Sequence, residues 1–308
     1  MSKTLTKVVC VGHLPYFGLH MPSSTDSLSV EHLEFYHGDS STVFNLLERF
    51  KPQILFAFRP ELIPASVLMA FSGLRIGFSS EIFPKLINFP SKIDPEHEGK
   101  LRFFLGSSIN FYDYMFHYDA ASQEYNESKG VFMSGYPPYP LNDKLFDDVN
   151  VEKDIDVLFI GRISKRRYQA LEKIKRRKIR LVSIDHGLFG DDIINLLRRS
   201  KVVLNIHAEK HVSFEPRVLI GAAVGACVVT EEINIPQWLP DNPFQIINID
   251  DENWIDKIDE SLIRFDHSFV ERQNFRNGLR SICSANKFLE DIINKARLGD
   301  VNRFQLIA

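Results

Sequence analysis

Short apolar runs alternate with amphipathic stretches through the first part of the chain. Such runs predict strands at Lys7–Val11, Leu33–Tyr36, Ile54–Phe58, Leu74–Phe78, Tyr112–Phe116 and Val131–Met133. Apolar residues at helical spacing predict helices at Ser41–Phe50, Leu62–Phe71 and Ala120–Ser128. Because parallel neighbouring strands need a crossover connection, the alternation favours βαβ units in a parallel sheet.

The stretch Gly135–Asp154 interrupts this pattern with three prolines and many acidic residues. Such a composition is typical of a connection between domains. We therefore expect a first domain over residues 1–140, a linker over 141–153 and a second domain over 154–283. A C-terminal helix and tail, 284–308, are expected to cross back to the first domain.

The alternation then restarts. Strands are predicted at Asp156–Ile160, Ile179–Ile184, Lys201–Ile206, Ala226–Thr230 and Phe244–Ile249. Helices are predicted at Lys165–Lys178, Asp191–Arg199, Pro216–Val224, Glu252–Phe265, Ser268–Ile282 and Asn286–Ala296. The expected architecture is two Rossmann-like, doubly wound α/β domains that face each other across a cleft, with ligands bound at the carboxyl ends of the strands.

Composition excludes several classes of protein. Of the 308 residues 44% are hydrophobic and 25% charged, which is globular composition, and the net charge of -3 argues against a nucleic-acid binder. No apolar run approaches the roughly 20 residues of a membrane helix. Three cysteines without metal-ligand spacing favour a reduced, cytoplasmic protein.

One segment, Lys165–Arg180, concentrates positive charge, with nine basic residues and one acidic residue. It is either a solvated helix face or a contact for anionic lipid headgroups, which would place the protein peripherally at the inner membrane face.

Polar residues follow three predicted strands of the first domain. His13 comes directly after the first strand, where a neutral imidazole can accept a proton from a hydroxyl group. The alternative is a loop histidine bonded to the backbone. Arg59 and Glu61 follow the strand that ends at Phe58, and Ser80 and Glu81 follow the next. They either contact an acceptor or cap the helices that begin there.

In the second domain Gly161 follows a strand and opens into a helix that carries Lys165. Backbone N–H groups at such a turn attract an anion, and Arg162, Lys165 or Arg166 adds positive charge opposite it. His207 follows another strand, while Glu215 and Arg217 stand where the next helix begins. The segment lacks both the Walker A and the GxGxxG pattern.

Four segments in the right order resemble the nucleotide-sugar domain of GT-B glycosyltransferases, most nearly the spore-maturation CgeB-like group. They are Asp113–Val131, Asp154–Ile174, Leu197–His207 and Phe214–Glu232. The last, FEPRVLIGAAVGACVVTEE, is similar to the family pattern RVFEALACGAFLLTD.

The resemblance implies that the second domain binds a nucleotide-sugar, which is a substrate, so that no cofactor is expected. It implies hexosyl or related sugar transfer to an unknown hydroxyl acceptor, in a cell-surface glycan, a lipid-linked molecule or a protein. No metal ion held by a DxD motif is implied. The donor residues implied are Gly161, Arg162, Lys165, His207, Glu215 and Arg217. His13 is the expected catalytic base of an inverting reaction, and Glu81 is the alternative.

One residue departs from the family pattern. Many relatives have a glutamate that binds the donor ribose where this chain has Ile220. Either Glu215 supplies that carboxylate, or the donor is different, or the protein does not catalyse transfer. Two other functions therefore remain open, a non-catalytic nucleotide-sugar-binding or assembly protein and a nucleotide-sugar epimerase.

Overall fold

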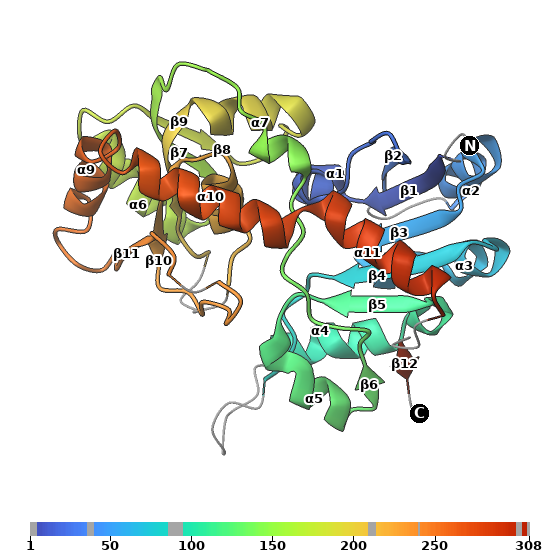
Figure 1. Ribbon diagram of the computed structural model, residues 1–308. Helices are drawn as coiled ribbons and strands as arrows, with labels where there is room; N and C mark the ends of the chain where they lie inside the picture. The colour runs from blue at the N-terminus through green and yellow to red at the C-terminus, as the bar shows by residue number, and fades with distance from the viewer. Residues whose placement is uncertain are drawn as a thin grey trace. The chain divides into compact units, whose positions relative to one another are not determined.

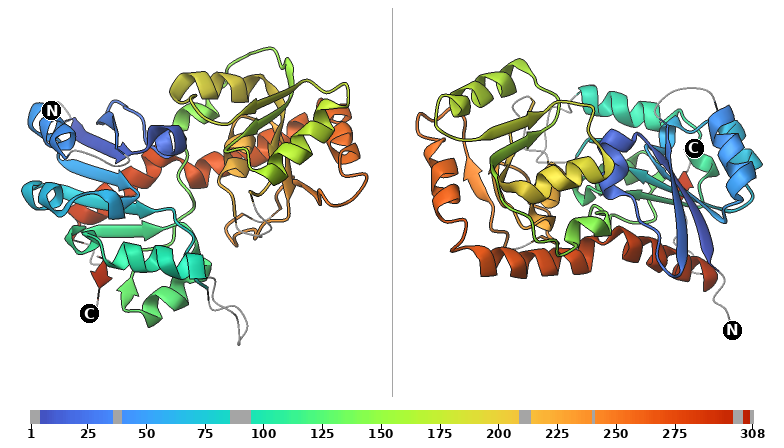
Figure 2. Two further views of the ribbon diagram at one scale, coloured as in Figure 1. Left: turned by 180° about the vertical axis from the view of Figure 1, so that it is seen from behind. Right: turned by 90° about the horizontal axis from the view of Figure 1, so that it is seen from above.

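The computed structural model describes residues 5–35, 40–85, 95–208, 214–239, 241–299 and 304–306 (Figure 1). Contacts divide the chain into two compact units, and each holds one five-stranded parallel sheet with helices packed on it. Unit 1 comprises Met1–Pro140 with Ala285–Ala308, and unit 2 comprises Leu141–Ser284. Figure 2 shows the sheet of each unit from two further sides. The predicted fold class of two parallel-sheet α/β domains is confirmed.

The sheet of unit 1 has the strand order β2-β1-β3-β4-β5, and every neighbouring pair is parallel. The strands are β1 (Thr6–Gly12), β2 (Leu28–Glu34), β3 (Ile54–Phe58), β4 (Leu74–Ser79) and β5 (Tyr114–His117). The helices are α1 (Leu14–Phe17), α2 (Ser41–Phe50), α3 (Ala65–Ala70), α4 (Pro95–Leu105), α5 (Gln123–Ser128) and α11 (Ala285–Arg297). Every residue of β3 is buried, as expected for a central parallel strand covered on both faces.

The two faces of this sheet are covered by different parts of the chain. Helices α2, α3 and α4 pack on one face through an apolar cluster that includes Val43, Val67 and Phe104. On the other face Phe288 of α11 meets the rings of β4 and β5, at centroid distances of 6.0 Å to Phe78 and 5.2 Å to Phe116. The abundance of phenylalanine in the sequence therefore reflects, in part, an aromatic layer between the sheet and the C-terminal helix.

Some elements of unit 1 differ from the expected ones. Strand β2 begins five residues before the expected Leu33. The prediction placed it too late because an edge strand tolerates half-buried polar residues, and these interrupt the apolar run by which a strand is recognised in the sequence. Strand β6 (Val131–Phe132) lies outside the main sheet and pairs antiparallel with β12 (Gln305–Leu306). Helix α4 was not predicted, since it buries only Leu101 and Phe104 and holds Gly99 in its interior.

Unit 2 repeats the same principle with the strand order β11-β10-β9-β7-β8, again all parallel. Its strands are β7 (Ile155–Ile160), β8 (Leu181–Ile184), β9 (Ser200–Asn205), β10 (Cys227–Glu231) and β11 (Gln245–Ile247). Its helices are α6 (Lys165–Lys175), α7 (Gly190–Arg199), α8 (Arg217–Ala223), α9 (Asp256–Ile263) and α10 (Phe269–Cys283).

Helix α8 lies unusually close to strand β9. A Cβ atom on Gly221 would lie 2.8 Å from the Cβ of Val203, so only glycine allows the helix to approach so closely. Helix α6 packs on the opposite face, because its Leu171 and Ile174 belong to the apolar cluster that Val202 and Leu204 enter from the sheet.

The segment 141–153, expected to be a linker, contributes to the interior of unit 2. It forms a short 3₁₀ helix, Asp143–Phe146, and buries Leu145 and Phe146. The proline-rich composition thus marks a change of unit, but the chain packs immediately after Pro140. Among the residues that the structure describes, no helix is long and apolar enough to cross a membrane.

His20 gives unit 1 a testable dependence on pH. The ring is buried, its Nδ1–H donates to the carbonyl of Pro140 at 2.8 Å, and it meets Tyr139 edge-on. Burial lowers the pKa of His20 from 6.5 to about 4, against the opposing effect of that hydrogen bond. The unfolded chain therefore binds a proton at a higher pH than the folded chain does, and stability is lost as the pH falls from 6.5 towards 4.

We expect this loss to reach about 3 kcal/mol at the acid end of that window. Urea unfolding of the wild type, compared with His20→Gln across the same pH range, measures it. The variant should be less stable near neutral pH and lose less stability on acidification. His186→Gln, at an exposed position, is the matched control and should follow the wild type. Equal acid sensitivity of both variants would contradict the assignment.

Candidate functional site

The turn after strand β7 brings a guanidinium group against the backbone. Gly161 has a φ of +138°, a conformation that side chains other than hydrogen rarely tolerate. A Cβ atom at this position would lie 2.7 Å from Nη2 of Arg217. Glycine is therefore required twice, by the backbone angle and by the close approach of Arg217.

A second guanidinium group lies beside the first. The guanidinium carbons of Arg167 and Arg217 are each 5.4 Å from the centre of the Phe159 ring. Arg167 donates to the carbonyls of Ile206 and Arg162, at 2.7 and 2.8 Å. Within the described ranges, no carboxylate lies within ion-pairing distance of either arginine.

The charges of these two arginines are only partly compensated. Burial, reinforced by the charge of Arg217, lowers the pKa of Arg167 from 12.5 to about 10. Burial also lowers the pKa of Arg217, against the opposing charge of Glu215. An anion that enters beside Gly161 would relieve this repulsion and replace lost hydration, which makes the pair a candidate anion site.

Glu215 supplies the negative charge in this neighbourhood. Its Oε1 lies 3.5 Å from Nδ1 of His207. Burial alone would raise the pKa of Glu215, but the contact with His207 and the charges of Arg217 and Arg167 outweigh it and lower the pKa to about 2. Glu215 therefore stays ionised at neutral pH and accepts hydrogen bonds only.

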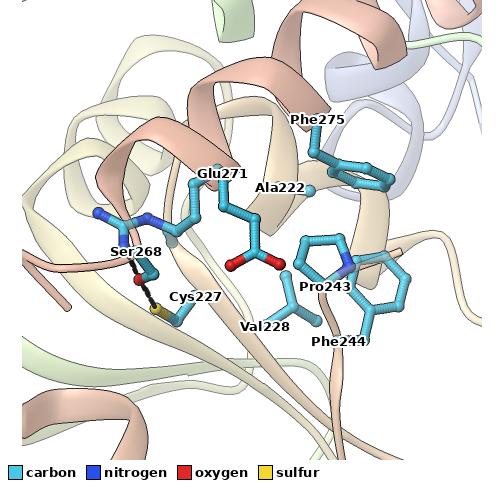
Figure 3. Close-up of a pocket in the computed structure, with 10 residues that line it drawn as sticks. Ala222, Cys227, Val228, Pro243, Phe244, Ser268, Glu271 and Phe275 are labelled. Atoms are coloured by element: carbon cyan, nitrogen blue, oxygen red, sulfur yellow. Dashed lines mark hydrogen bonds between the residues drawn. The ribbon is translucent and has the colours of Figure 1, made fainter. Parts of the chain in front are cut away.

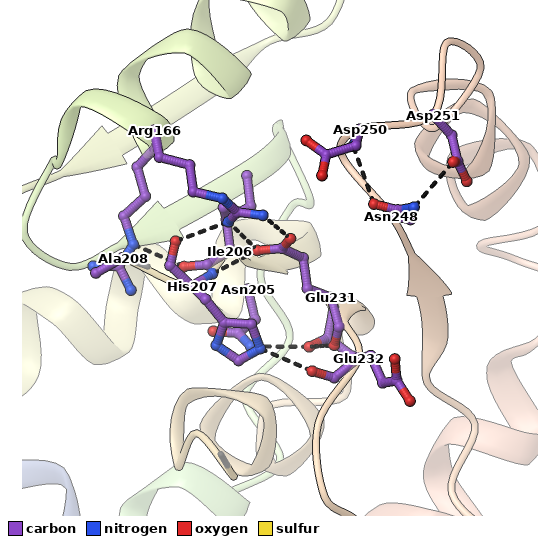
Figure 4. A network of polar contacts seen from close by, with 12 residues as sticks. Arg166, Asn205, Ile206, His207, Ala208, Glu231, Glu232, Asn248, Asp250 and Asp251 are labelled. Atoms are coloured by element: carbon purple, nitrogen blue, oxygen red, sulfur yellow. Dashed lines mark hydrogen bonds and ion pairs between the residues drawn. The ribbon is translucent and has the colours of Figure 1, made fainter. Parts of the chain in front are cut away.

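A polar network ties the ends of β9 and β10 together (Figure 4). Arg166 donates to both carboxylate oxygens of Glu231 and, at 3.1 Å, to the carbonyl of His207. Glu231 also accepts from the backbone N–H of His207 at 2.8 Å, while Nε2 of that ring contacts the carbonyl of Glu232 at 2.9 Å. These contacts fix the His207 backbone and ring at the carboxyl edge of the sheet.

Four of the predicted donor residues come together and two do not. Gly161, His207, Glu215 and Arg217 gather at the carboxyl edge of the unit 2 sheet. Arg162 and Lys165 have exposed side chains that make no hydrogen bond or ion pair in the described part of the chain. Arg166 and Arg167 lie at this edge of the sheet instead, where they donate to the carbonyls of His207 and Ile206. Arg166 was among the positive charges expected near the anion, whereas Arg167 was treated only as part of the basic segment.

The remainder of the basic segment is mostly a solvated, ion-paired surface. Lys175 pairs with Glu172, Arg177 with Asp256 and Arg180 with Asp154. Lys173, Arg176 and Lys178 are exposed. Contact of this segment with an anionic membrane stays a prediction.

In unit 1, His13 is held by a carboxylate that the sequence analysis missed. The parallel register pairs Gly12 at the end of β1 with Glu34 at the end of β2. Glu34 Oε1 lies 2.5 Å from Nδ1 of His13, and its Oε2 accepts the N–H of Leu14 at 2.6 Å. A carboxylate on one ring nitrogen orients the imidazole, which is what a positioned general base requires.

Glu81, the alternative catalytic residue, is engaged by two cations. Its oxygens lie 2.7 Å from Nη1 of Arg59 and 3.4 Å from Nζ of Lys100. It follows β4, which is separated from β1 by β3, so it does not share a strand end with His13. Glu81 is thus already paired with two cations, whereas His13 is oriented by a carboxylate.

A small cavity of about 50 Å³ lies at the opposite edge of the unit 2 sheet, where β10 begins (Figure 3). Cys227 lines it, with Sγ 3.7 Å from Nη1 of Arg272 and 3.9 Å from Oγ of Ser268. None of the predicted donor residues lines this cavity. Across the described ranges, no group of three or more His, Cys, Asp and Glu side chains is placed to hold a metal ion.

Comparison with known proteins shows what this fold resembles. No protein-family model matches the sequence, and no curated protein matches it either. The structure is similar to that of HepE from Anabaena in complex with UDP-glucose, with a TM-score of 0.56, 10% identity and coverage of 94% of this chain and 99% of that one.

Two further solved structures are similar. One is sucrose-phosphate synthase from Thermosynechococcus elongatus, with a TM-score of 0.55, 9% identity and coverage of 96% and 100% of the two chains. The other is AviGT4, a glycosyltransferase involved in avilamycin A biosynthesis, with a TM-score of 0.52, 13% identity and coverage of 96% and 97%. These neighbours are GT-B glycosyltransferases, and this chain has their fold.

The Gly161 turn yields a paired prediction on stability. Gly161→Ala introduces the strain of a positive φ, about 1–2 kcal/mol, and also displaces Arg217. Gly187 has a φ of +88° and open space around its Cβ position, so Gly187→Ala introduces the backbone strain alone. Urea unfolding should show Gly161→Ala to be the less stable by a further ~1–3 kcal/mol. Equal losses would mean that Arg217 does not depend on this turn.

Proposed function

We propose that the protein is a glycosyltransferase that moves a sugar from a nucleotide-sugar to a hydroxyl acceptor without a metal ion. The observation that carries the proposal is the pair of arginines beside Gly161, which make no ion pair with a carboxylate among the described residues and whose charges Glu215 compensates only in part. A diphosphate fits this site, because it brings the negative charge and hydrogen-bond acceptors that the guanidinium groups lack.

The same arginines serve the chemistry of transfer. When the glycosidic bond breaks, negative charge builds up on the leaving diphosphate, and prepositioned cations stabilise that charge more than the ground state. This role is the one a metal ion would otherwise have, which is why we propose metal independence. Membership of the CgeB-like group belongs to the same proposal and rests on the sequence resemblance.

Glu215 is our candidate for contact with the donor ribose. Ile220 stands where many family members carry the ribose-binding glutamate, and in this structure it is buried in α8. Glu215 precedes the same helix and is ionised, so it accepts from ribose hydroxyl groups. This assignment accounts for the departure at Ile220 without loss of donor binding.

For the transfer step we propose that His13 is the base of an inverting reaction. Its Nε2 takes the proton of the acceptor hydroxyl while that oxygen bonds to the anomeric carbon and the bond to the diphosphate breaks. Glu34 holds the ring through Nδ1 and stabilises the imidazolium that forms.

Incubation of the purified protein with a panel of nucleotide-sugars separates the candidate functions. A transferase releases nucleoside diphosphate, at least slowly through hydrolysis, and an epimerase converts the sugar without releasing it. A binding protein does neither, although its melting temperature rises with the nucleotide. Absence of both release and stabilisation with every nucleotide would contradict the proposal.

Donor binding is tested with UDP, the nucleotide with which HepE was crystallised. Arg217→Ala and Glu215→Ala should each weaken nucleotide affinity about ten- to hundredfold, because one charge-assisted contact contributes about 1.5–3 kcal/mol. Calorimetric titration measures this, with GDP and ADP tried in parallel. Arg264→Ala removes an exposed arginine of unit 2 and should bind like the wild type. EDTA should leave binding unchanged, and a loss of binding in EDTA would refute metal independence.

Turnover tests His13. His13→Ala should lower kcat by about a hundredfold or more while donor affinity stays nearly constant, since the base acts only in the transfer step. Glu34→Gln should give a smaller loss, because the amide still contacts the ring but no longer carries charge. His186→Ala is the control. Near-wild-type turnover of His13→Ala would point to Glu81 or to a retaining mechanism.

A further inference from the structure

The last paired residues of strands β9 and β10 are polar, although they lie inside unit 2. Two residues earlier in the register Val203 pairs with Val228, and both are buried. Asn205 then pairs with Thr230, and both of these side chains are fully buried as well. Because residues two positions apart on a strand face the same side of the sheet, this apolar face becomes polar at its carboxyl edge. Polar side chains buried in such a place need hydrogen-bond partners.

Arg217 is one of these partners, and the packing of helix α8 on β9 brings it there. Gly221 of α8 packs against Val203, and Arg217 precedes Gly221 by one turn of the helix. Asn205 follows Val203 on the same side of the strand. Nη1 of Arg217 donates to Oδ1 of Asn205 at 2.5 Å. The close approach at Gly221 thus holds Arg217 within reach of the amide.

The hydrogen bonds leave the amide of Asn205 a single orientation. The hydroxyl of Thr230 donates to the carbonyl of Glu231 at 2.7 Å, so its oxygen can only accept from Nδ2 of Asn205, 2.9 Å away. On the other side of the amide, the guanidinium group of Arg217 can only donate. A turned amide would set two donors against each other at Arg217 and two acceptors at Thr230. Oδ1 of Asn205 therefore faces Arg217.

A neutral amide holds Arg217 without cancelling its charge. A carboxylate in the same place would form an ion pair with the guanidinium group and leave less positive charge for a ligand. Glu215 compensates the charge of Arg217 only in part. Arg217 is half-buried, whereas Asn205 behind it is fully buried, so an anion that enters the site meets the guanidinium group and not the amide.

We propose that Asn205 is a positioning residue that, oriented by Thr230, presents Arg217 to the ligand with its positive charge intact and so makes the site selective for a diphosphate. The inference rests on the proposed nucleotide-sugar site. It adds that affinity rises with the negative charge of the ligand because the partner behind Arg217 is neutral. Asn205 and Thr230 do not touch the ligand and act through Arg217 alone.

Asn205→Asp tests the charge of this partner. The carboxylate is almost the same size as the amide, and the hydroxyl of Thr230 can turn to donate to it, so the variant should fold, which its melting temperature checks. Calorimetric titration compares UDP with UMP, or the corresponding pair where GDP or ADP binds the wild type more tightly. The diphosphate should bind the variant about ten- to hundredfold more weakly than the wild type. The monophosphate, which carries less charge, should lose less affinity.

Thr230 tests the orientation of the amide. Thr230→Val keeps the shape of the side chain but removes the acceptor for Nδ2 of Asn205, so it should weaken diphosphate binding about fivefold. Thr230→Ser retains the hydroxyl and should bind like the wild type. Asn277→Asp adds a carboxylate at an exposed position of α10 and is the control for the added charge. It should also bind like the wild type.

Three results overturn the inference and leave the donor site in place. They are wild-type diphosphate affinity in Asn205→Asp, equal losses of monophosphate and diphosphate affinity in that variant, and binding by Thr230→Ser that is as weak as that by Thr230→Val. A failure of the proposed function looks different. In that case UDP, GDP, ADP and inorganic pyrophosphate all fail to bind the wild type, and the nucleotide-sugar site and the inference are both refuted.

Discussion

The approach of Arg167 and Arg217 to one phenylalanine ring is the interaction on which the rest of the unit 2 site depends. Two like charges held together in a partly buried place must be fixed by other groups, and here the fixing groups are backbone carbonyls and the side chain of Asn205. Gly161 is needed because any larger residue would displace Arg217. The phosphate ligand that we propose would supply the negative charge that this arrangement lacks.

Unit 1 satisfies a comparable constraint with balanced charges. Arg59 has a φ of +62°, a left-handed conformation that costs a residue with a side chain about 1 kcal/mol or more. The conformation is maintained because it lets one guanidinium group reach Glu61 and Glu81 from two different turns. Unit 1 thus pairs one arginine, Arg59, with two carboxylates. In unit 2, by contrast, Arg167 and Arg217 make no ion pair with a carboxylate in the described part of the chain.

The sequence predicted what depends on local pattern. The bounds of α2 and β3 coincide with the expected ones, because a buried strand and an amphipathic helix each follow a simple period. His13, Gly161 and Arg217 were proposed as site residues for a related reason, since strand ends and the helix starts that follow them can be located along the chain. Helix α4 was missed, because it faces the core with few residues.

Contacts between distant segments could not be found in this way. The pairing of Glu34 with His13 depends on the register of β1 against β2, and the predicted β2 was displaced along the chain. Arg167 looked like one member of a basic surface, since nothing in a single sequence shows which side of a helix meets Phe159. A contact between side chains on two strands can be predicted only when the register of those strands is known. The sequence of a short edge strand such as β2 does not reveal that register.

The assignment of α11 to unit 1 has a consequence for the synthesis of the chain. The aromatic face of the first sheet is complete only when Phe288 arrives, and Asn286 bonds to Ser23 across 263 positions of sequence. At roughly 5–20 residues per second, the ribosome needs about 7–30 s to pass from Pro140 to Ala285. During that interval the phenylalanine side chains that Phe288 later covers are exposed on the nascent chain. A chaperone that binds exposed aromatic side chains has the most time to bind this surface before α11 is synthesised.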